Sequence, residues 1–266
     1  MKEIILTADN LGTQKKYRSN NYWYKINNLG NEALSETLSS LILKNADLPD
    51  NITFVDYNIC KINDKIACKS MDFLNPGERF VSLQAIYKYY ENKELSDEIF
   101  KLPDIKTRYL YLCNYFSEIC EINIADYLKC CLTLDAIICN PDRHFGNLGV
   151  IQKENGDFRL SPIFDNGQGL GQNFNITPPD IDYSEKIKLL NANTISGSFE
   201  LVINDIGSGF TINYDNLKED IDNFYNNNPE FCNNSIGNQV KEFLNKQLDK
   251  YEKLLSNSLE KENIDK

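Results

Sequence analysis

A long apolar segment that ends at a proline constrains the fold of this chain most strongly. Apolar residues cover most sides of the segment from Ile124 to Cys139. A helix that is apolar on all sides is normally buried at the centre of a domain. Pro141 disfavours helical geometry at Asn140, so the helix is expected to end there. The chain is therefore predicted to fold around a central helix that holds the following loop rigidly in place.

The loop after this helix contains groups that suit phosphate chemistry. It reads N-P-D-R-H-F-G-N, with Asp142 and Asn147 five residues apart, and a second acid, Asp165, follows in P-I-F-D-N-G. From one loop, an acid can accept a hydroxyl proton while an amide oxygen binds a metal. Carboxylate and amide oxygens are ligands that Mg²⁺ prefers. The pattern predicts a phosphate and metal site, whereas each residue alone would also fit a turn.

The stretch between the two acids is predicted to form a hairpin. Residues 148–152 and 158–163 favour strands, and Asn155-Gly156 between them is a strong turn signal. The end of this hairpin would bring Asp165 to the loop that carries Asp142.

Two charged residues near the loop have open roles. Arg143 could pair with an acid or with a phosphate. Asp135, the one acid in the second half of the apolar helix, could orient the loop through a hydrogen bond or face a polar seam.

The N-terminal part is predicted to form two strands joined by a glycine-bearing loop. Residues 3–8 and Tyr22–Ile26 favour strands. A loop between two strands can lay backbone N–H groups over phosphates, although a single glycine also fits an ordinary hairpin. The candidate nucleotide contacts in this loop are Gly12, Thr13 and Gln14.

Lys25 lies among aromatic residues in the second of these strands. Alternation places it on the same face as Trp23 but does not decide whether that face is buried. A buried lysine needs a partner, whereas an outward lysine does not. Leucines at helical spacing predict a helix from Asn31 to Asn45, with Asn31 as its N-cap. Glu32 and Glu36 share one face of that helix, and either could reach Lys25.

The remaining sequence alternates strand and helix signals. Strands are expected at residues 54–59 and 65–71, and the chain turns at Asn75-Pro76-Gly77. Helices are expected at residues 80–90 and 104–121. After Tyr214 the chain is helical, and apolar residues form one stripe along the last helix.

The two loop motifs together resemble a known family. D-R-H-x-x-N followed by F-D-x-G resembles the HipA-like protein kinases, including the CtkA type, and more distantly the phosphatidylinositol kinases. Ordinary protein kinases carry H-R-D at this loop, so the inverted order favours the atypical branch. The resemblance extends from about residue 8 to residue 260 and is strongest at Asp142–Gly149, Pro162–Leu170 and Lys25.

The resemblance implies an α+β, bilobal protein kinase-like fold. A small β-rich N-lobe would occupy residues 1–74, and a mainly helical C-lobe would occupy residues 75–266. The implied activity is transfer of a phosphoryl group from ATP, with Mg²⁺, to a Ser/Thr hydroxyl of a protein substrate, with autophosphorylation among the reactions. A lipid or small-molecule kinase and a nucleotide-binding pseudokinase are the alternatives.

The resemblance also implies roles for single residues. Lys25 would orient the α- and β-phosphates and pair with a helix glutamate, and the family spacing favours Glu32 over Glu36. Asp142 would orient and deprotonate the hydroxyl, while His144 would shape the loop. Asn147 and Asp165 would hold Mg²⁺. Backbone groups at Ser70, Met71 and Asp72 would bind the adenine edge.

The composition of the chain indicates which partners and which location to expect. The net charge of −11 disfavours binding of nucleic acid through a broad basic face, and Lys15 and Lys16 of the short basic stretch are expected in a solvated loop. Eight cysteines occur without a C-x-x-C pair, which favours free thiols in a reducing compartment. No signal peptide or transmembrane segment is evident, so a cytoplasmic location is the default expectation, with export by another route left open.

Overall fold

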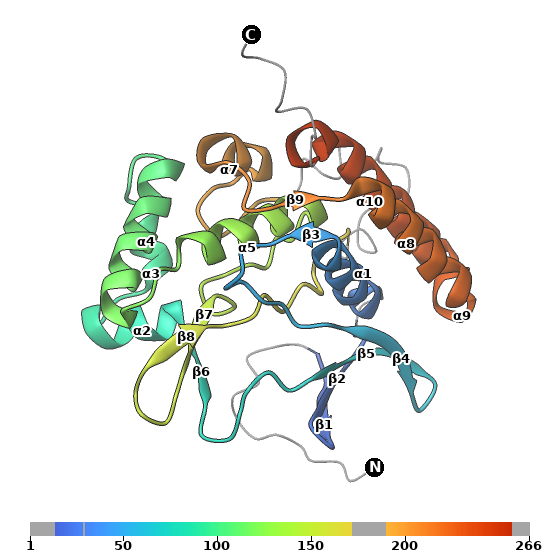
Figure 1. Cartoon of the computed structure of the whole chain (residues 1–266), viewed down its shortest axis with the longest axis horizontal. Helices are drawn as coiled ribbons and strands as arrows, with labels where there is room; N and C mark the ends of the chain where they lie inside the picture. Colours follow the sequence, from blue (N-terminus) through green and yellow to red (C-terminus); the bar gives the residue numbers. More distant parts are fainter. Residues whose placement is uncertain (1–13, 29, 172–189, 257–266) are drawn as a thin grey trace.

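The computed structural model describes residues 14–28, 30–171 and 190–256. A small antiparallel sheet and one helix occupy one side, and a mainly helical part occupies the other (Figure 1). The predicted α+β class is therefore confirmed. The predicted strand at residues 3–8, and the candidate contacts Gly12 and Thr13, lie outside the described residues. The division at residue 74 stays a prediction.

The sheet has the order β1-β2-β5-β4. Its strands are β1 (Lys16–Ser19), β2 (Tyr22–Ile26), β4 (Asn58–Ile62) and β5 (Lys65–Met71). Both hairpins turn through two residues with positive φ, at Asn20-Asn21 and at Asn63-Asp64. Asn and Asp tolerate this left-handed conformation, which matches the twist of the flanking strands. The predicted strand and turn positions at 22–26 and 63–71 are confirmed.

Helix α1 (Glu32–Lys44) packs on the inner face of this sheet. Its apolar residues Ala33, Leu38 and Ile42 are fully buried. The predicted N-cap, Asn31, precedes the helix but makes no capping hydrogen bond with its side chain. Asn27 takes that role instead, because its Oδ1 accepts a hydrogen bond of 2.7 Å from the N–H of Ala33.

Two predicted boundaries were wrong, and in both cases pairing with the C-terminal part explains the shift. Residues 54–57 do not extend β4, because Val55 N–H donates to Ile163 O and Phe54 bridges Ile163. Residues 79–82 form strand β6 (Arg79–Ser82), which pairs with β7 (Gly149–Gln152). Helix α2 (Leu83–Glu91) therefore begins after the predicted start at residue 80.

Helix α5 (Ala125–Ile138) runs through the middle of the helical part, as predicted (Figure 1). Strand β7 pairs with β8 (Phe158–Leu160), so the predicted hairpin is also confirmed. The helices around α5 are α3 (Leu95–Ile99), α4 (Ile105–Cys120), α7 (Phe199–Ile206), α8 (Tyr214–Asn227), α9 (Pro229–Cys232) and α10 (Ser235–Leu255), and β3 (Ala46–Asp47) pairs with β9 (Thr211–Ile212).

All eight cysteines are free, as the sequence predicted. Burial raises the pKa of the thiols in α5, Cys130 to about 12 among them, so they behave as small apolar residues. Within the described ranges, no helix has the length and apolar character needed to cross a membrane.

Candidate active site

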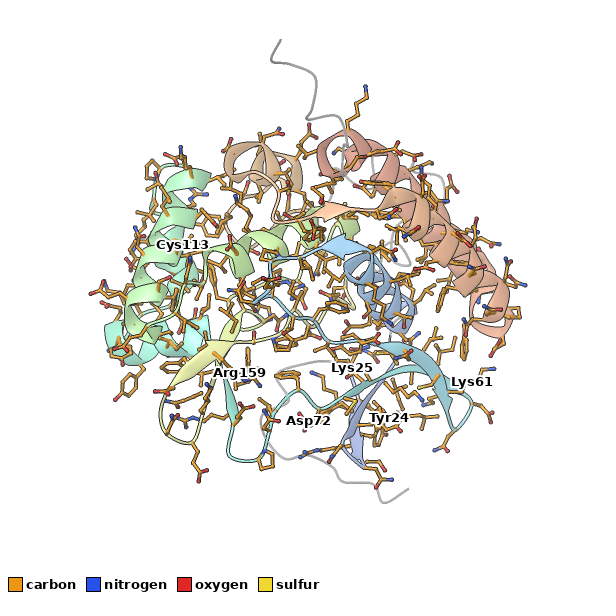
Figure 2. The ribbon with its side chains drawn as sticks, in the orientation of Figure 1. Tyr24, Lys25, Lys61, Asp72, Cys113 and Arg159 are labelled. Atoms are coloured by element: carbon orange, nitrogen blue, oxygen red, sulfur yellow. The ribbon has the colours of Figure 1, made fainter. Side chains whose placement is uncertain are left out.

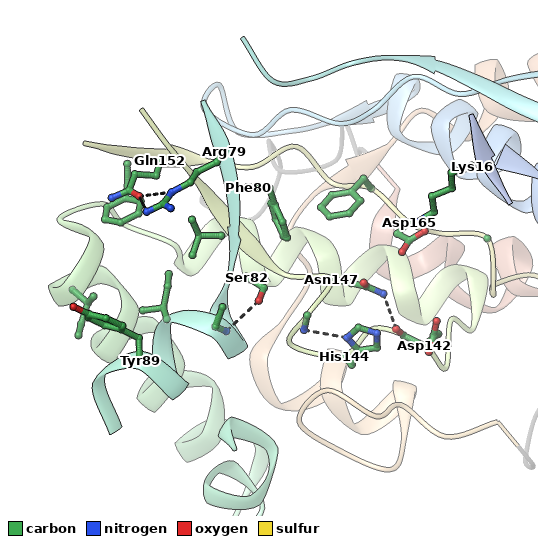
Figure 3. Close-up of a pocket in the computed structure, with 18 of the residues that line it drawn as sticks. Lys16, Arg79, Phe80, Ser82, Tyr89, Asp142, His144, Asn147, Gln152 and Asp165 are labelled. Atoms are coloured by element: carbon green, nitrogen blue, oxygen red, sulfur yellow. Dashed lines mark hydrogen bonds between the residues drawn. The ribbon is translucent and has the colours of Figure 1, made fainter. Parts of the chain in front are cut away.

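The candidate site is a cavity of about 940 Å³ between β1, β6, α2 and the loops around Asp142 and Asp165. Asp142, Asn147 and Asp165 all line it (Figure 3). The Phe164 ring, beside Asp165, packs edge-on against Phe80 of β6 at 5.1 Å between centroids. The structure thus brings the two predicted acids and the amide to one cavity, through the end of α5 and the end of the β7–β8 hairpin.

Lys25 lies behind Asp165 and contacts two carboxylates. Its Nζ is 2.6 Å from Glu36 Oε1 and 2.6 Å from Asp165 Oδ1. Lys25 lies on the face of the sheet that α1 covers (Figure 2), and it is almost fully buried. The preference for Glu32 as its partner was wrong. Glu32 lies in the first turn of α1, where its carboxylate accepts hydrogen bonds from the N–H groups of Asn28 and Gly30.

Burial and opposite charges together set the ionisation of Lys25, Asp165 and Glu36. Burial lowers the pKa of Lys25, but Asp165 and Glu36 outweigh this effect and raise it well above its ordinary value. Burial opposes ionisation of Asp165 as well, yet Lys25 and then Lys16 lower the pKa of Asp165. Burial raises the pKa of Glu36 despite Lys25. Lys25 is thus held as a cation directly beside the cavity.

Glu36 also fixes the backbone beside Asp165. Its second oxygen, Oε2, accepts a hydrogen bond of 2.8 Å from the N–H of Asn166, while Ser35 Oγ donates to Asn166 O at 2.7 Å. Asp165 itself has a φ of 62°, a left-handed conformation that is uncommon for residues with a side chain. Such a conformation persists where the surroundings constrain it strongly, often at functional sites. Helix α1 therefore sets the position of the Asp165 carboxylate.

Arg143 is a buried link between the two loops. Its Nε is 3.0 Å from Asp135 Oδ2, and the pair is almost fully removed from solvent. Its two terminal nitrogens donate to Phe164 O and to Asn166 Oδ1, each at 2.5 Å. Asp135 therefore orients the loop. The sequence had left open whether it does so or simply faces a polar seam. Arg143 pairs with this acid and with the loop that follows the hairpin.

The loop after α5 is shaped by its own polar groups. Asn140 Oδ1 accepts from the N–H of Asp142 at 3.1 Å, and Asn147 Nδ2 donates to Asp142 O at 3.1 Å. His144 Nδ1 accepts from the N–H of Gly146 at 3.0 Å, which is the loop-shaping contact expected of it (Figure 3). Partial burial, together with the nearby Asp165, raises the pKa of the Asp142 carboxyl.

Asn147 and Asp165 carry oxygens of the type that Mg²⁺ prefers. Donation by Asn147 Nδ2 to the loop fixes the amide and leaves its oxygen for a cation. Among the described residues, no three His, Cys, Asp or Glu side chains are grouped as a metal cage would require. Mg²⁺ needs no such cage, because it is usually held by one or two protein oxygens together with water and phosphates.

Three of the predicted adenine contacts lie outside the lining of the cavity. Ser70, Met71 and Asp72 do not line the cavity, whereas Gln14 does. The Met71 side chain is exposed at the end of β5, and Asp72 forms an ion pair with Arg18.

Two further residues, Lys16 and Asn166, belong to the site although the sequence did not predict them there. Lys16 was expected in a solvated loop, but it begins strand β1 and lines the cavity. The position of Lys16 opposite Lys25 in an alternating strand was the signal that could have identified Lys16. Asn166 joins Glu36 and Arg143. Nothing in the sequence distinguished its amide from an ordinary turn residue.

No protein-family model matches the sequence, and no curated protein matches it significantly. Among solved structures, the Helicobacter pylori proinflammatory kinase CtkA aligns over 91% of this chain and 90% of its own, with 16% sequence identity and a TM-score of 0.51. The chain has a CtkA-like fold. Shewanella oneidensis HipA, in a complex with HipB and operator DNA, aligns over 94% of this chain and 66% of its own, at 13% identity and a TM-score of 0.48.

Proposed function

We propose that this CtkA-like protein is a kinase that uses ATP and Mg²⁺ to phosphorylate Ser or Thr hydroxyls of a protein, its own chain included. The observation that carries the proposal is the convergence of Asp142, Asn147 and Asp165 on one cavity, with the buried Lys25–Glu36 pair directly behind Asp165. The likeness of the fold to a kinase supports it.

Each group has a role in the proposed transfer. Asp142 accepts the proton of the attacking hydroxyl, and Lys25 orients the α- and β-phosphates. Asn147 and Asp165 would hold Mg²⁺, which neutralises charge on the phosphates when it is bound. Catalysis of this kind depends on positioning and on charge, and the contacts of Glu36 and Arg143 supply the rigidity that positioning requires.

The end of β5 supports the predicted adenine contact through its backbone. Asp72 N–H donates to Asn21 O, so residues 21 and 72 form a hydrogen-bonded pair of the ladder. Met71, opposite Tyr22, then belongs to a pair without hydrogen bonds, which directs its N–H and C=O away from β2. Pairing with β4 ends at Lys69. The backbone of Met71 is thus available to a planar ligand edge.

Transfer of labelled γ-phosphate tests this function. The purified chain is incubated with ATP and Mg²⁺, alone and with a generic basic protein, and the label on protein is measured against an Asp142→Asn variant and an EDTA control. Label in the wild type, and its loss in both controls, would support a protein kinase. ATP binding without label on protein would favour a lipid or small-molecule kinase or a pseudokinase, and absence of ATP binding would refute the proposed site.

Glu36→Gln is expected to lower kcat/KM by about a hundredfold, a loss comparable to removal of one positioned polar group. The substitution removes the charge that holds Lys25 and weakens the contact with the Asn166 N–H. Glu32→Gln is the matched control, because this glutamate is equally buried on the same helix but accepts hydrogen bonds from the N–H groups of Asn28 and Gly30. Steady-state kinetics would contradict the assignment if Glu32→Gln had the larger effect.

As the pH is lowered, activity is expected to be lost at a higher pH than it would be if Asp142 had the pKa of a free aspartate. Asp142 acts as a base only when it is ionised, and burial with nearby Asp165 raises its pKa, so protonation begins earlier as the pH falls. Profiles of kcat/KM against pH would show this limb, and ¹³C NMR titration of the Asp142 carboxyl should give the same pKa. A value at or below that of a free aspartate would contradict the expectation.

A further inference from the structure

The segment that leads into helix α7 lies against the loop that carries Asp142. Asn193 Nδ2 donates a hydrogen bond of 2.6 Å to Pro141 O, and Thr194 Oγ1 donates one of 2.5 Å to Arg143 O. Pro141 and Arg143 are the residues on either side of Asp142. Two consecutive side chains from a distant part of the chain therefore hold the backbone on both sides of the proposed base.

These two hydrogen bonds complete a set of three. The carbonyl oxygens of Pro141, Asp142 and Arg143 each accept a side-chain hydrogen bond, and the one to Asp142 O comes from Asn147 within the loop. The loop's own contacts thus orient the middle peptide unit of the three, whereas the outer two depend on the segment before α7. Loss of either outer donor would allow a peptide unit next to Asp142 to tilt.

The segment before α7 is itself firmly held. Ile195 is fully buried, and its carbonyl oxygen accepts a hydrogen bond of 2.9 Å from Arg108 of helix α4. Thr194 is 3% exposed, so water does not compete for its hydroxyl, whereas Asn193 is exposed. A side chain can position a loop precisely only when its own place is fixed by packing and hydrogen bonds. The segment before α7 meets this requirement.

The proposed role of Asp142 depends on the direction of its carboxylate. A base can take the proton only when it lies within hydrogen-bond reach of the reacting hydroxyl. Within the described part of the chain, no protein group donates a hydrogen bond to the Asp142 carboxylate. Its direction therefore follows from the backbone that carries it, and a displacement of about 1 Å can cost roughly a hundredfold in rate.

We propose that Asn193 and Thr194 are positioning residues for phosphoryl transfer, which fix the backbone on both sides of Asp142 and so direct its carboxylate toward the substrate hydroxyl. The assignment rests on the proposed kinase function. The Arg143–Asp135 pair holds the loop through the interior, and the segment before α7 holds it from a second direction.

Steady-state phosphoryl transfer by the full chain tests the assignment. Asn193→Ala and Thr194→Val are each expected to lower kcat by about threefold to tenfold, the range for one neutral hydrogen bond, with the KM for ATP unchanged. Thr194→Ser keeps the hydroxyl and should keep most of the rate. Asn191→Ala is the matched control, because Asn191 is also exposed in the same segment, and it should act as the wild type does.

Amide hydrogen exchange tests the same contacts without relying on activity. In the double variant Asn193→Ala/Thr194→Val, the amides of residues 142–147 should exchange faster than in the wild type, while those of helix α5 keep their protection. Faster exchange throughout the chain would show a general structural role and would overturn the assignment.

The outcomes separate this assignment from the function on which it rests. Wild-type kcat in both single variants, or unchanged exchange of the loop in the double variant, overturns the assignment and leaves the kinase proposal intact. A rise in the KM for ATP with no change in kcat also overturns it, because a nucleotide contact would then be affected instead of the base. A wild-type chain that binds ATP and transfers no phosphate overturns the proposed function, and the role in catalysis falls with it.

Discussion

Asp165→Asn is expected to lower kcat for phosphoryl transfer by about a thousandfold or more. The substitution keeps the size of the side chain and removes its charge. Asp165 has two functions that need this charge, because it forms an ion pair with Lys25 and would hold Mg²⁺. Its strained backbone at a φ of 62° can be kept, since asparagine tolerates the left-handed conformation as well. The loss should therefore come from chemistry and not from unfolding.

Single-turnover kinetics with saturating ATP and Mg²⁺ would measure this effect. Asp97→Asn is a suitable control, because this aspartate is exposed on helix α3, away from the cavity. Thermal unfolding of Asp97→Asn should match that of the wild type, and Asp165→Asn should remain folded at the assay temperature, because Lys25 keeps its ion pair with Glu36. Transfer by Asp165→Asn at a rate close to the wild-type rate would exclude Asp165 as the metal-binding acid.

Arg143→Ala is expected to destabilise the fold by about 3–5 kcal/mol, because it leaves the buried Asp135 carboxylate without its partner. It also removes the hydrogen bonds to Phe164 O and Asn166 Oδ1, so the loops that carry Asp142 and Asp165 would lose their common link. By comparison, Lys44→Met breaks an exposed ion pair with Asp56 and should cost about 1 kcal/mol or less. Urea unfolding would measure both changes.

The double variant Asp135→Leu/Arg143→Met separates stability from function. Replacing both charges with apolar side chains removes the unpaired buried charge, so much of the stability should return. Activity should stay low, since methionine cannot donate to Phe164 O and Asn166 Oδ1. Recovery of activity together with stability would mean that Arg143 only supports the fold.

The elements that short-range signals specify were predicted correctly. Helix α5 follows from its apolar run and from Pro141, and the β7–β8 hairpin follows from Asn155-Gly156. The convergence of Asp142 and Asp165 on one cavity was also predicted, because both lie a few residues beyond well-defined elements. Local propensity is enough to predict an element where the signals within the segment and those in its flanking residues indicate the same structure.

Pairing between distant segments explains the boundaries that were missed. Residues 79–82 form a strand because β7 offers hydrogen-bond partners more than sixty residues further along the chain. Residues 53–55 bond to Ile163 in the same way. Hydrophobic periodicity within one segment contains no information about such partners.

The sequence by itself determined which residue types meet at the candidate site: a loop acid, an amide, a second acid and a strand lysine. Only the tertiary structure decided which glutamate holds Lys25, that Arg143 joins Asp135 to the Asp165 loop, and that Lys16 faces the cavity while Lys15 does not. Glu32 and Glu36 lie one helical turn apart, so their spacing alone could not separate them. The physical reason is that a side chain's partner depends on the packing of elements far apart in the chain, and this packing also determines which charges are buried and must be paired.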